Sequence, residues 1–288
     1  MTDVYYRLKR ILKRGRLTLR RLIAALRWGW KPVAEAPPVF GNAMPKAGSH
    51  LLLQILYGLV DIGPFIKPGF PPINRFEDNS HLSEEEMVRE IQRMESGEIR
   101  FGYLPYREPF VSLLTKNGMA VVFIYRDPRD LLVSHVFYAL DIHEGHSMHE
   151  YYSRELSSME QRLNVAIEGC QKPGLELPDV RERIQDNLGW LEDDHVLSVK
   201  FEDLIQNRDH TLGMILDYIQ GFGVDFPLSR TAAVAALGRA IQPQKSGTFR
   251  KGQPGNWREH FTQENKEKFK DLAGDLLIEL GYEQDHDW

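Results

Sequence analysis

Two separated segments of this chain carry residue types that can bind phosphate-like anions. The first spans residues 45–50, Pro-Lys-Ala-Gly-Ser-His, and the second spans residues 125–134, Tyr-Arg-Asp-Pro-Arg-Asp-Leu-Leu-Val-Ser. Each follows an apolar run typical of a buried strand and precedes a stretch typical of a helix. The first turn of a helix presents unpaired N–H groups and a partial positive charge, so a strand, a turn and a helix start can together hold an anion. Two such sites in one domain predict a ligand with two well-separated phosphate-type groups.

The residues of the first segment each suit an anion site. Gly48 allows the backbone to approach an anion closely, Lys46 supplies a mobile positive charge, and Ser49 places a hydroxyl at the helix start. The segment is not a Walker A motif, because it lacks the pattern Gly-x4-Gly-Lys-Ser/Thr. Taken alone, six residues of this kind also fit an ordinary turn between a strand and a helix.

The elements that must position these segments alternate between strands and helices. The run before Tyr125 has no polar residue, which is typical of a parallel strand covered on both faces. Strands are expected at 39–44, 99–104, 120–125 and 196–201. Helices are expected at 51–60, 83–96, 131–139, 153–170, 180–192, 209–221 and 263–280. This order predicts an α/β fold: a single domain with a central parallel sheet flanked by helices, a phosphate site like that of P-loop proteins, and an added N-terminal basic helix.

Charge is distributed unevenly along the 288 residues. The net charge is −5, but residues 1–31 hold ten Lys or Arg and one acid, a charge of +9 that leaves −14 for residues 32–288. A nucleic-acid-binding domain is expected to be basic, so no nucleic-acid partner is predicted. The single cysteine, Cys170, excludes an internal disulfide and favours a reducing compartment, and a cytoplasmic location is expected. No run of 18 apolar residues occurs, so no membrane-spanning helix is expected.

The basic segment 1–31 has the periodicity of an amphipathic helix. Its apolar stripe, opposite an arginine-rich face, consists of Leu8, Ile11, Leu12, Gly15, Leu19, Leu22, Ile23, Leu26 and Trp30. Such a helix can lie peripherally on the inner face of an anionic membrane or bind a partner. Docking on the protein's own body and an organellar targeting function are the alternatives. Residues 32–38 contain three prolines and are expected to form a linker before a folded domain at 39–288.

A third segment makes the two anion sites more specific. Residues 249–257 have the sequence Phe-Arg-Lys-Gly-Gln-Pro-Gly-Asn-Trp. Together with residues 45–51 and 125–134, this segment resembles the signature of the sulfotransferases that use 3′-phosphoadenosine 5′-phosphosulfate (PAPS). The resemblance covers residues 39–282 in the same order. It implies a sulfotransferase domain with PAPS as donor, 3′-phosphoadenosine 5′-phosphate (PAP) as product, and no metal.

The resemblance also implies which residues bind the donor. They are Lys46, Ala47, Gly48, Ser49, His50, Arg126, Ser134, Phe201, Arg250, Lys251 and Gly252. In the family, the lysine loop holds the 5′-phosphosulfate, an Arg…Ser pair eight residues apart holds the 3′-phosphate, and the Arg-Lys-Gly loop closes over that phosphate. The matching aromatic, Phe201, lies by the adenine in the family. An ion pair with Asp127 or Asp130 is the structural alternative for Arg126, and a solvated basic loop is the alternative for residues 250–252.

Sulfuryl transfer needs in-line positioning and charge stabilisation on oxygen more than covalent help from the protein. By analogy with phosphoryl transfer, Lys46 is expected to neutralise the leaving phosphate, which makes it the first catalytic candidate. The base for the acceptor hydroxyl is open. Many family members have a histidine where Tyr103 stands, and tyrosine, with a pKa near 10, is a poor base. Glu77, 31 residues after Lys46, matches a glutamate of carbohydrate-acting members, and His50 is a third candidate beside the option of no base.

Other functions and ligands compete with this interpretation. His143, His146 and His149 are spaced i, i+3, i+6 and drift round a helix, so a solvated or acceptor-lining cluster is favoured over zinc. The acceptor is expected to be a hydroxyl of a glycan, lipid or small metabolite, bound between segments 61–81 and 139–160. The alternative is a catalytically impaired nucleotide-binding or membrane-recruited interaction protein. A P-loop kinase is disfavoured, because a full Walker A motif and a clear magnesium-binding carboxylate are missing.

Overall fold

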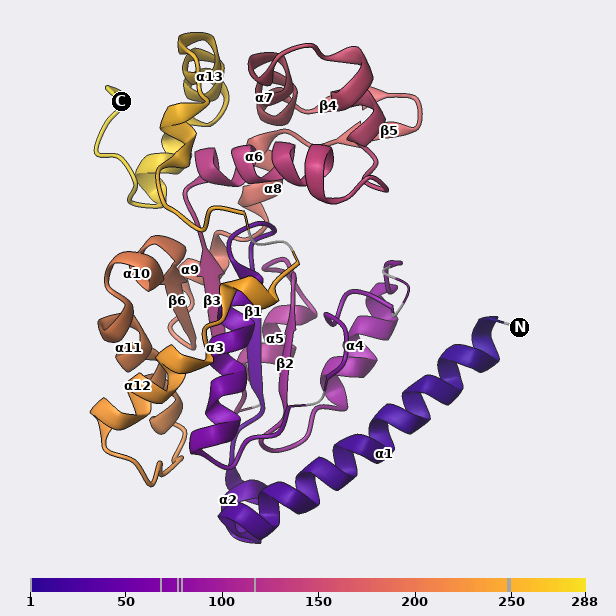
Figure 1. The fold of residues 1–288 in the computed structure, drawn as a ribbon, viewed down its shortest axis with the longest axis vertical. Coiled ribbons are helices and arrows are strands. Elements are labelled where there is room, and N and C mark those ends of the chain that lie inside the picture. Colours follow the sequence, from indigo (N-terminus) through magenta and orange to yellow (C-terminus); the bar gives the residue numbers. More distant parts are fainter. Residues whose placement is uncertain (1, 68, 77, 79, 117, 248–249) are drawn as a thin grey trace.

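A four-stranded parallel sheet forms the centre of the molecule (Figure 1). The computed structural model describes residues 2–288 except 68, 77, 79, 117 and 248–249, and for residues 2–10 it describes the backbone alone. The strands are β1 (Val39–Ala43), β2 (Ile99–Gly102), β3 (Ala120–Tyr125) and β6 (Val196–Lys200), in the order β2-β1-β3-β6. The chain leaves β1 toward β2 and returns to pair β3 on the opposite side of β1. The carboxyl ends of β1 and β3 therefore flank a topological switch point, where open α/β sheets bind ligands.

Both faces of the sheet are covered, as the apolar strand sequences predict. Phe40, Val121 and Phe123 contribute to one hydrophobic core, and Val122 and Ile124 contribute to the other, with the period of two that strands impose. The second core is closed by α3 (Ser49–Ile62), α11 (Arg208–Gln220) and α12 (Arg230–Ala240). This arrangement confirms the expected α/β class and the central parallel sheet.

The remaining helices surround the sheet and form a layer above its carboxyl edge (Figure 1). Near the sheet lie α4 (Glu84–Gln92), α5 (Phe110–Thr115), α9 (Gly189–Glu192) and α10 (Phe201–Gln206). The upper layer holds α6 (Pro128–Phe137), α7 (Met159–Glu168), α8 (Val180–Gln185), α13 (Gln263–Glu279) and a hairpin of β4 (Cys170–Lys172) and β5 (Leu175–Leu177). Two π-helical turns, Tyr138–Ile142 and Tyr151–Glu155, and two 3-10 turns, Pro243–Lys245 and Asn256–Glu259, complete the described elements.

Two of the expected helices, at 83–96 and 263–280, are present and have capping residues at one end. Ser83 caps α4 in a reciprocal capping box with Glu86, and Gly281 follows α13 with φ of 67°. Three helices that flank the sheet, α5, α10 and α12, were not expected. The first two, with six residues each, are too short to establish a hydrophobic period, and α12 is rich in alanine, so its sequence shows no apolar stripe.

The N-terminal segment forms a long helix, α1 (Thr2–Trp28), and a short one, α2 (Trp30–Glu35), separated by Gly29 with φ of 97°. Part of the segment expected to be a linker is therefore helical. Pro32 does not prevent this, because it lies in the first turn of α2, where the backbone N–H groups have no intrahelical partner to lose.

The arginine-rich face of α1 contacts the body of the protein. Arg14 pairs with Glu90 at 3.5 Å and Arg21 pairs with Glu95 at 2.9 Å, while the Arg27 guanidinium donates a hydrogen bond of 3.0 Å to the Asp61 carbonyl. Small and medium side chains fill the contact, namely Leu17, Ala24 and Ala25 against Ile66 and Phe70. Docking on the protein's own body, one of the alternatives for this helix, is thus present.

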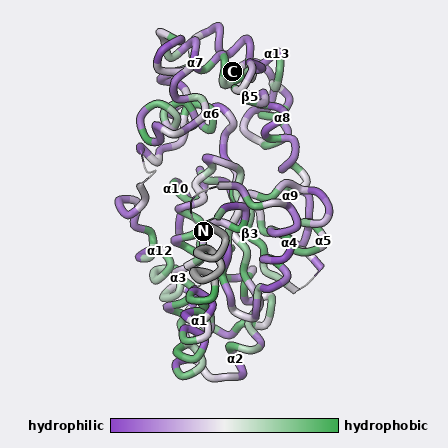
Figure 2. Tube along the Cα trace, turned by 90° about the vertical axis from the view of Figure 1, so that its right-hand side faces the viewer, coloured by the Kyte–Doolittle hydropathy of each residue, from purple (hydrophilic) through white to green (hydrophobic). Residues whose placement is uncertain are grey.

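The apolar stripe of α1 faces away from the body, which reverses the usual orientation of an amphipathic helix. Six of its described side chains, together with Trp30 at the start of α2, are exposed by fractions from 41% at Leu22 to 81% at Leu26. In Figure 2, where α1 faces the viewer, green hydrophobic stretches alternate with purple hydrophilic ones along it. An exposed stripe of this size is a feature of surfaces that meet a partner or a membrane.

Candidate functional site

The turn after β1 has the backbone geometry of an anion-binding loop. Lys46 has φ of 70° and Gly48 has φ of 97°, so two left-handed residues enclose Ala47. Among the described residues, Lys46 is the one non-glycine position with positive φ, which is a strained conformation typical of functional sites. No side chain caps α3, which begins at Ser49. In its first turn the Leu51 N–H donates to the Gly48 carbonyl at 2.9 Å, which leaves the N–H groups of Ser49 and His50 available to an anion.

Gly48 is required here for a second reason. A Cβ on this residue would lie 2.7 Å from the ring of Phe201, closer than carbon atoms can approach. Phe201 begins α10 directly after β6, and its ring also lies beneath the guanidinium of Arg126, 4.3 Å from its central carbon. One aromatic ring therefore contacts both of the predicted anion-binding segments.

Lys46 lies close to Tyr138, a residue that the sequence motifs did not predict to be part of the site. Its Nζ atom lies 3.4 Å from the centre of the Tyr138 ring, a cation–π contact. Tyr138 begins the π-helical turn that follows α6, and π-helical turns are frequent at functional sites. Burial, and then the positive charge of Arg126, lowers the pKa of Lys46 to about 7. The lysine is thus poised to gain a full charge when an anion arrives.

Arg126, at the carboxyl end of β3, is the central cation of the site. It is 8% exposed, and its guanidinium contacts the Asp130 carboxylate at 3.3 Å and the Gln253 carbonyl at 3.1 Å. The ion-pair alternative for this arginine is therefore present. Its Nε atom is buried and has no hydrogen-bond partner among the residues that the structure describes. The arginine thus keeps donor capacity that a ligand could use.

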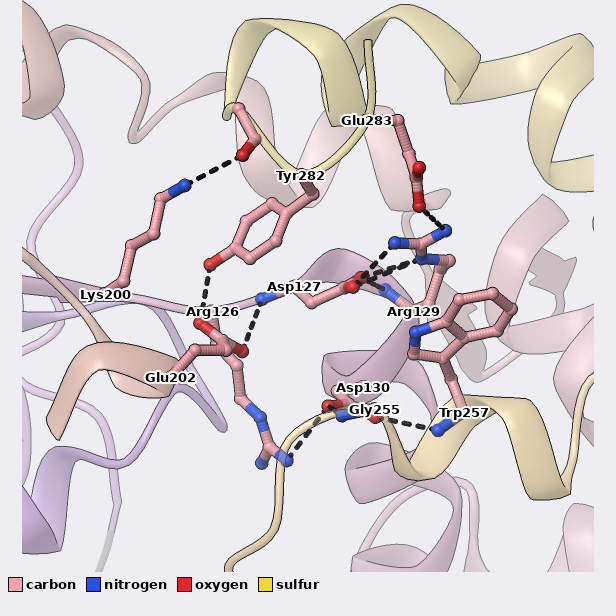
Figure 3. A network of polar contacts seen from close by, with 11 residues as sticks. Arg126, Asp127, Arg129, Asp130, Lys200, Glu202, Gly255, Trp257, Tyr282 and Glu283 are labelled. Carbon is pink, nitrogen blue, oxygen red and sulfur yellow. Dashed lines mark hydrogen bonds and ion pairs between the residues drawn. The ribbon is translucent and has the colours of Figure 1, made fainter. Parts of the chain in front are cut away.

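The C-terminal loop meets α6 through a dense polar network (Figure 3). Asp130 accepts hydrogen bonds of 2.8 Å from the backbone N–H groups of both Gly255 and Trp257. Arg129 binds Asp127 with both Nε and Nη2, and its guanidinium lies 3.9 Å from the centre of the Trp257 ring. These contacts place the loop that contains residues 250–252 beside the second anion-binding segment.

The other predicted donor-binding residues lie around this centre. The Arg250 guanidinium stacks 4.2 Å from the Phe137 ring, and partial burial followed by the charge of Arg126 lowers its pKa. Ser134 is half-buried on α6. Lys251 turns aside to pair with Glu259 at 2.5 Å, and Gly252 has φ of 61°. Arg126 therefore lies in electrostatic reach of both Lys46 and Arg250, a crowding of positive charge that an anion would relieve.

The candidate bases occupy different environments. The Tyr103 hydroxyl lies 2.7 Å from Ser49 Oγ, and burial raises the pKa of this tyrosine. Desolvation, and then the charge of Lys46, lowers the pKa of His50, which is the second residue of α3. Glu77 lies outside the described residues. A neutral histidine can accept a proton, whereas a tyrosine with a raised pKa cannot act as a base near neutral pH.

The histidine cluster lies beside Tyr138. The ring centres of His143 and His146 are 5.6 and 5.9 Å from that of Tyr138, and the positive charge of Lys46 contributes to lowering the pKa of His146 after desolvation and His143. The three histidines lie in turns and the start of the following helical segment rather than along one helix. Within the described part of the chain, no three His, Cys, Asp or Glu side chains are grouped as metal ligands.

Comparison with known proteins identifies the family. A family model for the sulfotransferase domain matches residues 37–222, more than half of the chain. The chain belongs to the sulfotransferase family. The family prediction is thereby confirmed, and the activity is sulfuryl transfer.

Relatives of this sulfotransferase match over most of their length. Sulfotransferase 6B1 from Homo sapiens is 24% identical over 256 residues, covering 83% of this chain and 78% of that protein. A flavonol sulfotransferase-like protein from Flaveria bidentis is 22% identical over 282 residues, covering 86% and 84%. Mouse sulfotransferase SULT7A1, solved in complex with PAP, superposes with a TM-score of 0.59 at 19% identity, covering 84% of this chain and 85% of that one. Retinol dehydratase, solved with androsterone and the inactive cofactor PAP, superposes with a TM-score of 0.56 at 15% identity. The match covers 85% of this chain and 83% of that one. The two superpositions show a shared fold.

The sequence analysis did not predict Tyr138 as a residue of the site, and it did not predict the contact of Asp130 with the C-terminal loop. Tyr138 carries no motif, and only the irregular helical turn brings it over Lys46. Asp130 was considered only as a competing partner for Arg126. Its two bonds to the loop at Gly255 and Trp257 span more than 120 residues of sequence, which no local pattern predicts.

Proposed function

We propose that this sulfotransferase uses PAPS as donor and transfers the sulfuryl group to a hydroxyl of the acceptor. The observation that carries the proposal is that Lys46 and Arg250 both lie within electrostatic reach of Arg126. The guanidinium of Arg126 stacks on Phe201, next to the uncapped start of α3. Lys46 suits the 5′-phosphosulfate, and Arg126 with Arg250 suits the 3′-phosphate. The PAP bound in the mouse sulfotransferase and in retinol dehydratase supports this choice of nucleotide.

The reaction follows from the chemistry of the groups. The acceptor oxygen forms a bond to sulfur while the bond between sulfur and the bridging phosphate oxygen breaks, leaving PAP with the added charge. Lys46 would stabilise that charge, and the N–H groups of α3 would hold the phosphate. The acceptor proton passes to a base or to water. Of the described candidates, the lowered pKa of His50 favours it over Tyr103, and Glu77 stays a prediction.

The donor assignment predicts a strong preference for a 3′-phosphate. PAP should bind at least about 30-fold more tightly than adenosine 5′-phosphate, because Arg126 and Arg250 would make charge-assisted hydrogen bonds that only PAP can accept. Isothermal titration calorimetry of the full chain with the two nucleotides measures the difference. Equal affinities would exclude the proposed donor site.

We also propose that the outer face of α1 lies on an anionic membrane surface. The exposed stripe offers apolar side chains for insertion, and exposed basic residues, including Arg16 and Lys31, flank it. Positive charge is concentrated further where the helix contacts the body, since Arg20 and Lys245 contribute to a lowered pKa of Lys67 after desolvation. No described helix is long and apolar enough to cross a membrane. A peripheral position in the headgroup region fits both the charge and the stripe.

Vesicle flotation tests this surface. The full chain should float with vesicles containing phosphatidylserine, and the double variant Leu19→Glu/Leu26→Glu should lose most of this binding, because two charges would have to enter the apolar layer. The matched control is Met214→Glu/Leu228→Glu, which changes two exposed apolar residues elsewhere on the protein. Unchanged flotation of the α1 variant would contradict the proposal. Self-association of the wild type without vesicles would assign the stripe to a second copy instead.

A further inference from the structure

Asp130 is the buried acidic residue at the centre of the polar network in Figure 3. It is 1% exposed and lies in the first turn of α6. Its carboxylate accepts the N–H groups of Gly255 and Trp257, each at 2.8 Å, and contacts the Arg126 guanidinium at the longer distance of 3.3 Å. Three donors from two distant parts of the chain therefore converge on one carboxylate.

The hydrogen bonds from the loop to Asp130 are shorter than the contact with Arg126, and their donors are backbone N–H groups, which cannot turn to another partner. A backbone N–H that is buried without a partner is costly, and a carboxylate is its strongest natural acceptor. Arg126 is less dependent on Asp130, because it also donates to the Gln253 carbonyl and its Nε atom lacks a partner among the described residues. Asp130 thus fixes the loop firmly and holds the arginine only weakly.

The loop fixed in this way leads directly to the Arg-Lys-Gly segment. Gly255 and Trp257 follow Arg250 by five and seven residues, and Gly255 has φ of 74°, so the turn between them has a definite shape. On the other side, Arg126 precedes Asp130 by four residues. One carboxylate therefore determines the distance between the two arginines that would hold the 3′-phosphate.

We propose that Asp130 is the positioning residue that holds the 250–257 loop against Arg126 and thereby builds the specificity for a 3′-phosphate. The inference rests on the proposed donor site. The alternative is that Asp130 only competes with the phosphate for Arg126. The two ideas predict opposite effects of neutralising the residue, because a competitor's removal would tighten binding and a positioning residue's removal would weaken it.

The test uses the ratio of the dissociation constants for adenosine 5′-phosphate and PAP, termed here the 3′-phosphate ratio. Asp130→Asn leaves one acceptor oxygen for two backbone N–H groups and turns an NH2 group toward the other, so the loop should loosen. We expect the 3′-phosphate ratio to fall about tenfold or more, with the affinity for adenosine 5′-phosphate nearly unchanged. Hydrogen exchange at the amides of Gly255 and Trp257 should accelerate in the same variant.

A second variant acts on the loop and leaves the core intact. Gly255→Ala places a side chain at a left-handed position on a partly exposed residue, and should lower the ratio about fivefold. The control for general destabilisation is Glu98→Gln, which weakens another buried ion pair, with Arg100 at the edge of the sheet, and should leave the ratio unchanged.

The outcomes separate this inference from the donor assignment. A lowered ratio in Asp130→Asn and Gly255→Ala supports the positioning role. An unchanged or increased ratio in Asp130→Asn overturns the positioning role. If Asp130→Asn does not fold, an unchanged ratio in Gly255→Ala is sufficient to overturn that role. A wild-type ratio near one would overturn the donor site itself, and the positioning role with it.

Discussion

Replacing Lys46 with alanine is expected to lower kcat by about 10²- to 10³-fold while leaving the fold intact. The bridging oxygen gains negative charge as its bond to sulfur breaks. Lys46, which gains its full charge when the donor binds, is the cation expected to stabilise that oxygen. Its contact with the Tyr138 ring keeps the Nζ atom in place without neutralising it. The affinity for adenosine 5′-phosphate should fall much less than kcat, because the N–H groups of α3 would still hold the phosphate.

Turnover is measured with an acceptor that the wild type sulfates, selected from a panel of a phenol, a steroid, a sugar and a fatty alcohol. The matched control is Lys268→Ala, which removes a partly buried lysine of α13 that pairs with Glu168 of α7. Circular dichroism and thermal unfolding verify the fold of both variants. A Lys46→Ala protein that keeps more than about a tenth of the wild-type kcat would contradict the charge-stabilising role.

Much of the donor site could be predicted from sequence because its signals are local. Each anion-binding segment is a strand, a turn and a helix start, and the special residues of such a unit lie within ten positions of one another. Lys46 and Gly48 are such residues, because both adopt the left-handed backbone conformation within the six-residue segment 45–50. The parallel pairing of β1 with β3 then brings the two segments together without any further information from the sequence.

The contacts that tune the site were not predictable, because they depend on packing between distant elements. Tyr138 reaches Lys46 only through the π-helical turn after α6, and Gly255, which binds Asp130, is separated from it by 125 positions in the sequence. Hydrophobic periodicity likewise identified α1 but not its orientation. The acidic partners Glu90 and Glu95 decide that orientation by binding its arginine face, and they turn the apolar stripe outward.

The affinity for PAP is expected to decrease as the pH rises above neutrality. Burial and the charge of Arg126 lower the pKa of Lys46 to about 7 in the free protein, so the lysine is protonated below that pH and increasingly neutral above it. A bound phosphate favours the charged form and raises the pKa again. Binding above pH 7 must therefore take up a proton. The affinity should fall by a factor that approaches tenfold per pH unit, and by about 50-fold in all between pH 7 and pH 9.

Calorimetry in buffers with different ionisation enthalpies measures this proton uptake directly. Nearly one proton should be taken up per PAP at pH 8.5, and about half a proton at pH 7. The neighbouring His50 does not mimic the effect, because its pKa is lowered and it is already neutral in this range. Lys46→Arg is the matched control, since arginine does not titrate below pH 12, and its affinity for PAP should be constant from pH 7 to pH 9. If the wild type were equally constant, the positive charge of Lys46 would already be complete before the donor binds. The desolvated lysine would then not be the group that couples donor binding to pH.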